Sequence, residues 1–532
     1  MKNKIFLFIA GIITLASCSR KLEDININPN NPSTVEADFL LTTSIFETMN
    51  LYGGQMNRAI FYNYTHHYSG FQGEFQRYTF VQSENNTNWR NTFINALQPV
   101  HQIVKNYSAS PVHKNRVLIA RLWKDYIFSN AVSMWGPIPM SEALEGTPQV
   151  PYQKEQDIYY FLLDDLRNIA DSISLTGDKF TANADKIYGG DLLKWKKFAN
   201  TLRLRLALRI SNADAAKAQQ VVGEIFEREQ YTIKSEAETA TAKWDATSSS
   251  TWSPLYDRVV YNYTANKATI PVINESLIYH MAPYNDPRLP VYAQPAKQGP
   301  MKDKYFGQNI AYGGGSGYAR YAGTVNPHTG LKQDDYSYIG TRFLAPDAEY
   351  VFLSYAESSF LKAEAALKGW WGNPNASQYY YEGIDASILR YGLTAAQATA
   401  YKNTPGVKWG SASDTLGREA QFQDYLRIAS SYVPAGDYMR QIVMQHWLAI
   451  PGQGVDAWAL LRRTQILEFE PQFATYDGLY KYMPQRIPYP SDELQTNPKE
   501  VAKAVQWLGG PDDLFTKLWF ALPTKKNPYL PY

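Results

Sequence analysis

Residues 346–372 read "PDAEYVFLSYAESSFLKAEAALKGWWG", and residues 375–393 read "NASQYYYEGIDASILRYGL". The first stretch has apolar residues at helical spacing and closes on Gly369 and Gly372, so it predicts one strong helix that ends there. The second stretch predicts its antiparallel partner. Small residues on the first helix would let the two backbones approach closely: Ala356, Ala363 and Ala366.

Three earlier segments, residues 112–135, 154–173 and 191–210, show the same helical periodicity. Their apolar stripes are Val117, Ala120, Leu122, Tyr126, Ile127 and Val132; Ile158, Phe161, Leu162, Leu166, Ile169 and Ala170; and Leu192, Trp195, Phe198, Ala199, Leu202, Leu206 and Ile210. Such helix–turn–helix pairs are similar to tetratricopeptide repeats, which stack into superhelices. We therefore predict a mainly α fold with a scaffold of tetratricopeptide-like helical pairs.

The helix expected at 191–210 also has a basic side, formed by Lys194, Lys197, Arg205 and Arg209. A basic amphipathic helix can lie on an anionic membrane surface. The alternative is that these charges pair with acids on neighbouring helices. We expect the second arrangement.

Residues 230–345 differ from the rest, because Gly, Pro, Tyr, Asn and Ser dominate and the helical period is lost. Loops of this length in compact proteins usually carry function. No charged or Gly/Ser-rich linker divides the chain. We predict one helical domain over 37–532, with a long irregular, loop-rich insertion at about 230–345.

The chain starts with "MKNKIFLFIAGIITLASC". A positive start and an apolar run over 5–15 are typical of a secretory signal peptide, and the run is shorter than the roughly 20 residues of a membrane-spanning helix. Cys18 is the only cysteine, so it cannot form an internal disulfide. "LASC" resembles the lipobox of bacterial lipoproteins; ordinary cleavage beside an incidental cysteine is the alternative. We predict a signal peptide (1–17), a lipid attachment site (Cys18) and a tether (18–36).

Charge argues against a nucleic-acid partner. Without residues 1–17, the 52 Lys and Arg residues fall to 50, equal to the 50 Asp and Glu residues. The chain is 14% aromatic and contains 40 Tyr. Because the tyrosine hydroxyl favours a wet edge, such a surface suits amphipathic ligands such as sugars. Many of these tyrosines could instead cap helix–helix contacts.

Six segments in order carry a family resemblance: "LEDININPNNP" (22–32), "FSNAVSMWGPIPMSEAL" (128–144), "IYGGDLLKWKKFANTLRLRLALRIS" (187–211), "SYAESSFLKAEAALKGW" (354–370), "VMQHWLAIPGQGVDAWALLRRT" (443–464) and "RIPYPSDELQTNP" (486–498). Together they resemble the SusD/RagB family of nutrient-binding outer-membrane lipoproteins, in its SusD-like branch. The resemblance covers essentially the whole chain after residue 17.

The resemblance implies four tetratricopeptide-like helical pairs and a loop-rich face with the ligand site. It also implies a lipid-anchored position on the outside of the outer membrane, and a partner: a SusC-like TonB-dependent outer-membrane barrel, which receives the captured ligand. Glu23-Asp24 resembles the surface-export signal of such lipoproteins, although Arg20 and Lys21 precede it. Family ligands are usually oligosaccharides, and some members handle peptides.

Loop aromatics are the expected ligand contacts, because a sugar ring can stack on an aromatic ring. By position in the chain, the resemblance points to an early and a middle loop. The candidates are Tyr68, Phe71, Phe75, Tyr78 and Trp89 in the first, and Tyr305, Tyr312, Tyr318 and Tyr321 in the second. Each could instead be buried, or could contact the barrel, since aromatics are also enriched at interface cores.

Motifs for catalysis, cofactors or metals are not recognisable in the sequence. His66-His67 lacks a second ligand cluster. Glycosidases need two carboxyls held across a cleft, which sequence neighbours such as Asp164-Asp165 or Asp512-Asp513 do not ensure. Asp334 and Asp335, in the long loop, could accept hydrogen bonds from ligand hydroxyls or hold a cation. We predict a binding protein rather than an enzyme, with no cofactor and no metal.

Three other functions fit parts of these observations. The same kind of lipoprotein could bind oligopeptides instead of oligosaccharides. A surface hydrolase would need one of the carboxylate pairs to be catalytic. A scaffold without a small ligand would use the loop aromatics only to hold the barrel.

Overall fold

A computed structural model of the chain describes residues 36–69, 81–147, 149–261, 270–299, 301–308, 332–372, 375–413, 432–467, 469 and 483–522. In this part the fold is mainly helical, and its strands form three small antiparallel sheets. The strands are β1 (Tyr68–Ser69) with β5 (Val272–Ile273), β2 (Ile138–Pro139) with β3 (Tyr152–Gln153), and β4 (Ala240–Lys243) with β6 (Glu349–Leu353).

The longer helices are α3 (Ala37–Thr48), η1 (Met49–Phe61), α5 (Gln82–Arg90), α6 (Gln98–Tyr107), α7 (Lys114–Trp135), α8 (Glu155–Ser172), α9 (Leu192–Arg209), α10 (Ala215–Phe226), α15 (Tyr355–Leu367), α16 (Ala376–Leu389), α17 (Ala395–Lys402), α20 (Tyr438–Ala449), α21 (Gly454–Thr464) and α23 (Pro498–Leu508). Shorter helical segments include η3 (Asn91–Leu97), α11 (Pro254–Tyr256), η7 (Asp257–Tyr261), α13 (Glu275–Met281), η11 (Thr341–Leu344) and α22 (Ser491–Thr496). The first helix continues from α3 into η1 with wider, π-helical turns.

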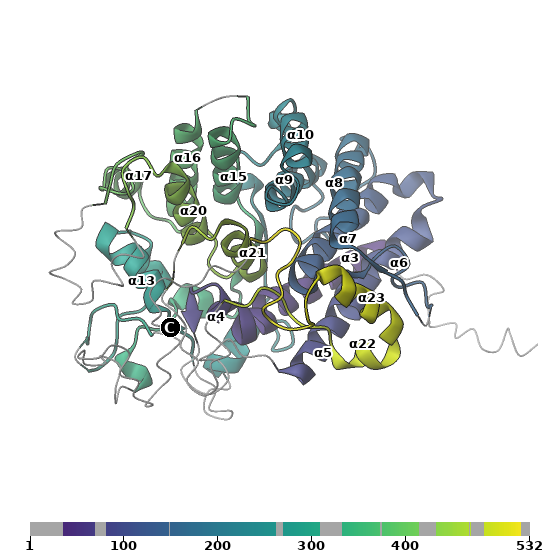
Figure 1. Cartoon of the computed structure of the whole chain (residues 1–532), viewed down its shortest axis with the longest axis horizontal. Helices are drawn as coiled ribbons and strands as arrows, with labels where there is room; N and C mark the ends of the chain where they lie inside the picture. Colours follow the sequence, from purple (N-terminus) through teal and green to yellow (C-terminus); the bar gives the residue numbers. More distant parts are fainter. Residues whose placement is uncertain are drawn as a thin grey trace, which may run out of the picture.

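Helical pairs form a row across the upper part of the molecule, where α8, α9, α10, α15 and α16 stand side by side (Figure 1). The most extensive contact between two helices is that of α15 with α16. Gly383 of α16 allows it, because a Cβ there would lie 2.6 Å from the Phe360 ring of α15. The predicted pairing is confirmed, and a glycine on the second helix makes room for an aromatic ring of the first.

The sequence predicted that residues 349–353 belong to the first helix of the pair, and this prediction was wrong. They form β6, which pairs antiparallel with β4, more than 100 residues earlier. The side chain of Ser354 then accepts a hydrogen bond from the backbone N–H of Glu357 and caps α15. Aromatic and β-branched residues suit a strand once a partner is present, so a distant pairing decides this segment.

Helix α9 runs through the core and is buried nearly all round. Arg205 donates to both carboxylate oxygens of Glu357, at 2.7 and 2.6 Å, and lies 3.1 Å from Asp456. Arg209 binds the other oxygen of Asp456 at 2.6 Å, and Lys197 reaches Glu238 at 2.5 Å. The expected ion pairs with neighbouring helices are therefore confirmed for these three residues.

The apolar stripes read from the sequence are buried except at two positions, one on α8 and one on α7. Phe161 is 52% exposed, so it belongs to the outer face of that helix. Val117 of α7 is half-buried. In the described residues, none of the helices is long and apolar enough to cross a membrane.

The segment between β4 and β6 contains only short elements where it is described, and it joins the helical row through a buried arginine. Arg288, with a fully buried side chain, donates to Asp286 at 2.6 and 2.9 Å. The same guanidinium donates to Ser387 of α16 at 2.8 Å and to Gln445 of α20 at 2.9 Å. These contacts fix the 286–288 turn against the scaffold.

Candidate functional site

Tyr68 was expected at the ligand, and the structure places it in the core. It lies in β1, is 1% exposed, and packs against Tyr62 and Phe343 with ring centroids 5.1 and 6.2 Å away. A side chain with this exposure offers no face to a ligand in this conformation.

Trp89 lies on α5, at the opposite end of the lower part of the molecule from α13 (Figure 1). It is 7% exposed and packs on Phe93 and Trp135, at 4.7 and 5.1 Å between ring centroids. Trp89 also lines a cavity of about 340 Å³ between α5 and α22.

Tyr305, Asp334 and Asp335 lie in the loop-rich part. Tyr305 is half-buried, and burial raises the pKa of its hydroxyl. Asp334 accepts a hydrogen bond from the Tyr338 hydroxyl at 2.5 Å, and Asp335 accepts one from the backbone N–H of Lys332 at 2.5 Å. Both carboxylates thus stabilise their own turn.

Several predicted residues lie outside the described residues: Cys18, Phe71, Phe75, Tyr78, Tyr312, Tyr318 and Tyr321. His66 and His67 are described and buried. Burial lowers their pKa to about 3 and about 4, so both are neutral at pH 7. His67 bonds to the Trp447 carbonyl at 2.9 Å and stacks on that indole. The described residues contain no group of three His, Cys, Asp or Glu that could hold a metal.

A cavity of about 300 Å³ lies between η1 and residues 249–258. We call it the aromatic hollow, because Trp252 forms part of its wall and is the centre of an aromatic cluster. Tyr256 and Tyr261 pack edge-on to the Trp252 ring, with centroids 5.2 and 4.8 Å away. Tyr261 is 60% exposed. Apart from Gly54 and Pro254, the remaining wall is formed by polar side chains: Asn50, Gln55, Arg58, Ser249, Ser250, Asp257 and Arg258.

Local sequence positions Trp252 through a compact polar turn. Asp245 accepts a hydrogen bond from the Thr247 N–H at 2.8 Å, and Thr251 Oγ1 donates to the Asp245 carbonyl at 3.0 Å. The indole N–H of Trp252 then donates to the Ala246 carbonyl at 2.9 Å. Asp, Ser and Thr favour such side-chain-to-backbone turns, so the indole is held in place while part of its surface remains accessible.

Close packing holds the opposite wall in place. A Cβ on Gly54 would lie 2.6 Å from the Pro254 ring, so only glycine lets the 253–255 segment cross η1 this closely. Burial is the main cause that lowers the pKa of Arg58, and repulsion from the positive charge of Arg258 lowers it further. The hollow thus brings a positive charge, amide groups and an aromatic face into one space.

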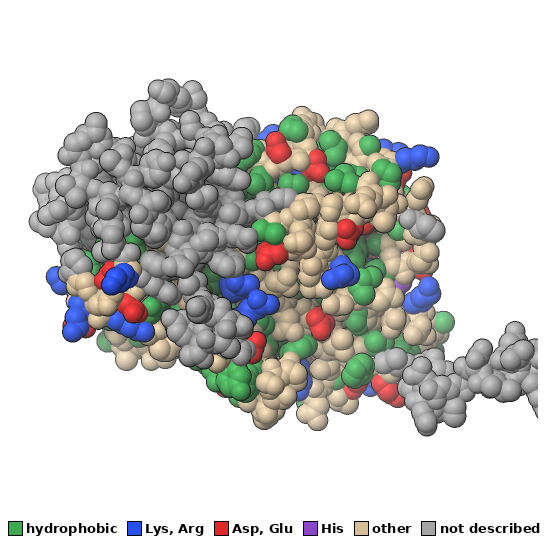
Figure 2. Space-filling model, turned by 90° about the horizontal axis from the view of Figure 1, so that it is seen from below, with side chains coloured by type: hydrophobic (Ala, Val, Ile, Leu, Met, Phe, Trp, Pro, Cys, Tyr) green, Lys and Arg blue, Asp and Glu red, His purple; other side chains and the backbone are tan. Residues whose placement is uncertain are grey.

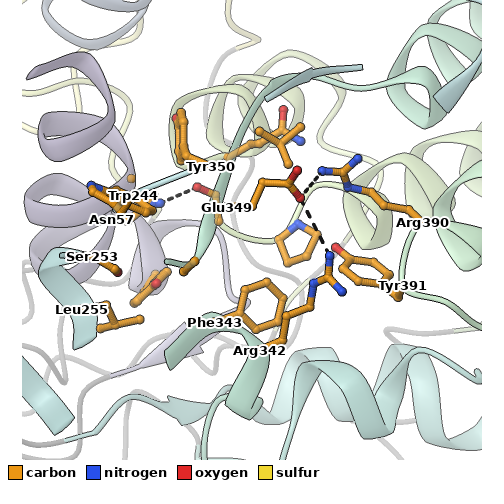
Figure 3. Close-up of a pocket in the computed structure, with 17 residues that line it drawn as sticks. Asn57, Trp244, Ser253, Leu255, Arg342, Phe343, Glu349, Tyr350, Arg390 and Tyr391 are labelled. Atoms are coloured by element: carbon orange, nitrogen blue, oxygen red, sulfur yellow. Dashed lines mark hydrogen bonds and ion pairs between the residues drawn. The ribbon is translucent and has the colours of Figure 1, made fainter. Parts of the chain in front are cut away.

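A second, smaller cavity of about 60 Å³ lies across the 253–255 segment from the aromatic hollow. Figure 3 shows that η1, η11, β6 and the end of α16 contribute its labelled walls. We call it the arginine crevice, since Arg342 and Arg390 both point to Glu349, at 3.9 and 2.6 Å (Figure 3). Its aromatic lining consists of Tyr62, Trp244, Phe343, Tyr350 and Tyr391.

The arginines of the crevice differ in environment. Arg390 is 8% exposed; burial by itself would lower its pKa, but the carboxylates of Glu349 and Glu236 outweigh burial and raise it. Arg342 is 49% exposed. Arg390 is therefore a fixed structural cation, whereas Arg342 can still donate hydrogen bonds to a ligand.

Sequence reasoning missed Trp252, Tyr256 and Tyr261, although it placed the ligand face in the insertion that contains them. "TWSPLYDRVVY" (251–261) has aromatics in a turn-rich stretch, which was the available signal. The lower face of the molecule mixes basic, acidic and apolar side chains in the part that the structure describes (Figure 2). Such a surface suits a polar, uncharged ligand.

Comparison with known proteins matches residues 29–490 to a family model described as "Starch-binding associating with outer membrane". The chain belongs to the SusD-like family. Members of this family are binding proteins, so the protein is not an enzyme. No curated protein sequence matches the chain.

Solved structures show the same fold. A chitin-binding protein is 25% identical, with a TM-score of 0.72 over 92% of this chain and 100% of its own. A SusD-like protein from Bacteroidetes is 20% identical, with a TM-score of 0.75 over 92% and 100% of the two chains. A chitin-binding SusD homologue from Flavobacterium johnsoniae is 20% identical, with a TM-score of 0.72 over 91% and 98%. The SusD-like arrangement thus extends over nearly the whole chain.

Proposed function

We propose that this protein is a cell-surface lipoprotein that captures oligosaccharides and delivers them to a SusC-like TonB-dependent barrel. The aromatic hollow is the observation that carries the glycan assignment. It combines the ring of Trp252, beside which Tyr261 is exposed, with amide, carboxylate and guanidinium groups that can bond to hydroxyls. Its volume of about 300 Å³ is at the lower end of the range for ligand sites.

The names of the related proteins support a carbohydrate ligand. The family description names starch, and two relatives of the same fold are named for chitin binding. A sugar presents a C–H face that stacks on an aromatic ring and hydroxyls that bond at the edge. By analogy with base stacking, one such aromatic contact contributes about 1–3 kcal/mol.

Replacing Trp252 by alanine is expected to weaken glycan binding by about 5- to 150-fold, which corresponds to the loss of one stacking contact. Tyr261→Ala is expected to act in the same direction, because its ring is 60% exposed beside Trp252. Isothermal titration of the purified protein against a panel of oligosaccharides measures both effects.

Trp507 provides the matched control, since it is a 38% exposed tryptophan on α23, away from the hollow. Trp507→Ala should leave the affinity unchanged. Equal affinities for the wild type and for Trp252→Ala would place the ligand elsewhere. Retention of peptide mixtures with no oligosaccharide bound would replace the glycan proposal by the oligopeptide alternative.

The proposed lipid anchor and the proposed SusC-like partner are inferred from the sequence. Cys18→Ala is expected to abolish incorporation of labelled palmitate and to release the protein from the outer-membrane fraction, because the thiol carries the lipid in the proposed lipoprotein. Wild-type protein that stays unlabelled would contradict the anchor.

Co-purification of a barrel transporter with the wild-type protein from its own membranes tests the partner.

A further inference from the structure

Two arginines from different elements line the aromatic hollow. Arg58 lies on η1 and Arg258 lies on η7, and both form part of the wall together with Trp252. The close contact between Gly54 and Pro254 holds the two segments against each other. Two guanidinium groups that are about 200 positions apart in the sequence therefore share one cavity.

The wall of the hollow has an excess of positive charge. Asp257 is the one carboxylate among its described lining residues, against two guanidinium groups. Arg258 is exposed and forms no ion pair with a described residue. Its positive charge acts on Arg58, whose pKa is lowered first by burial and then by this repulsion; Glu84 acts in the opposite direction but lies outside the wall. An anion bound beside both arginines would reduce the repulsion between them.

The rest of the wall indicates what kind of molecule carries the anion. Trp252 offers an aromatic ring, and the side chains of Asn50, Gln55, Ser249 and Ser250 can bond to hydroxyls. An inorganic anion would use neither feature. A hexuronic acid ring would use both, because its C–H face can stack on the indole while its hydroxyls bond to the polar groups. Its carboxylate also matches the planar fork of a guanidinium group.

We infer that the aromatic hollow binds a hexuronic acid ring of an oligosaccharide, with its carboxylate held by Arg58 and Arg258 and its ring stacked on Trp252. Asp257 and the mixed charges of the lower face oppose a densely charged chain, so isolated acidic rings among neutral ones fit better (Figure 2). This inference rests on the proposed glycan-binding function and goes further, because it names the class of glycan.

Two acidic oligosaccharides test the inference: a hyaluronan hexasaccharide, and a xylotriose that carries a glucuronic acid branch. Each is used as the free acid and as the methyl ester, which keeps the sugar rings and removes the charge. The wild-type protein should bind at least one free acid about tenfold or more tightly than its ester, as a charge-assisted contact would give. Raising the salt concentration should reduce this difference, because salt screens exposed charges. Titration calorimetry measures each affinity.

Arg258→Gln removes one cation from the wall. It should weaken binding of the preferred free acid about 3- to 10-fold and leave binding of the methyl ester unchanged. Tm should not fall, because Arg258 is exposed and has no ion pair in the described structure.

Arg90→Gln is the matched control. Arg90 is also exposed and forms no ion pair with a described residue, but it lines the α5–α22 cavity instead of the hollow. The control changes the net charge by the same amount and should leave every affinity unchanged. An equal effect of both variants would show a general attraction of anions to the protein and would overturn the site.

The possible results separate this inference from the proposed function. Equal binding of each free acid and its ester overturns the acidic-ring assignment, and so does binding of neutral maltohexaose or chitohexaose alone; both leave glycan capture intact. Tighter binding of a sulfated heparin hexasaccharide than of either acid also overturns the assignment. Failure of the wild type to bind any oligosaccharide, neutral or acidic, overturns the proposed function and this inference together.

Discussion

Arg205→Met is expected to destabilise the protein by about 3–5 kcal/mol, because it removes one partner of a buried ion pair and leaves the other charge behind. Arg205 and Glu357 are 4% and 1% exposed, and the guanidinium binds both oxygens of the carboxylate. The pair joins α9 to α15. Denaturant unfolding followed by circular dichroism measures the change in the free energy of unfolding.

Arg167→Met is the matched control, since it removes an arginine that is 47% exposed and lies 4.0 Å from Asp171. Exposed pairs contribute about 0–1 kcal/mol, so this change should be small. A loss of stability in Arg205→Met no larger than that of Arg167→Met would refute the argument from burial.

The same ion pair predicts how stability depends on pH. Burial alone would raise the pKa of Glu357, but the positive charge of Arg205 together with the hydrogen bonds from His446 and Arg205 outweighs burial and lowers the pKa from 4.5 to about 2. A carboxyl with a lowered pKa stabilises the fold fully above its ordinary pKa and loses that contribution as the pH falls from about 4.5 to about 2. The wild type should lose stability over this window, and Arg205→Met should lose less.

Arg288→Met is expected to cost a similar 3–5 kcal/mol, because it leaves the carboxylate of Asp286 buried without its cation. Arg288 donates three side-chain hydrogen bonds to Asp286 and one each to Ser387, Tyr401 and Gln445, so the change also releases the 286–288 turn from α16 and α20. Thermal unfolding of the variant measures the loss as a lower Tm.

The double variant Asp286→Asn, Arg288→Met distinguishes two costs. One is the cost of burying the Asp286 carboxylate without a cation, and the other is the cost of losing the hydrogen bonds that Arg288 makes to α16 and α20. The introduced amide would keep an acceptor for the backbone N–H at position 288, which Asp286 accepts at 2.9 Å in the wild type. Partial recovery of Tm relative to Arg288→Met is expected. A double variant less stable than the single one would show that the uncompensated carboxylate is not the main cost.

Much of the helical scaffold could be predicted from the sequence, because helical periodicity is a property of neighbouring residues. The α7, α8 and α9 segments and the α15–α16 pair follow from it, and Gly369 lies two residues beyond the last residue of α15. The strand at residues 349–353 could not be predicted in this way, because it depends on pairing with the distant strand β4.

The candidate site was less predictable. The sequence predicted a ligand face in the insertion and named Tyr68, which is 1% exposed, as a contact, but it did not name Trp252 or Tyr261. An aromatic residue in a loop-like stretch has the same appearance in sequence whether its ring is covered or not. Only the packing of other segments against it decides its exposure.

By itself, then, the amino-acid sequence determined the family, the helical class and the places where the main helices run. Tertiary structure alone decided that Arg205 and Arg288 are buried with partners far along the chain, and that Trp252 lines an open hollow. The physical reason is that backbone periodicity depends on residues within a few positions, whereas burial and hydrogen-bond pairing depend on segments hundreds of positions apart.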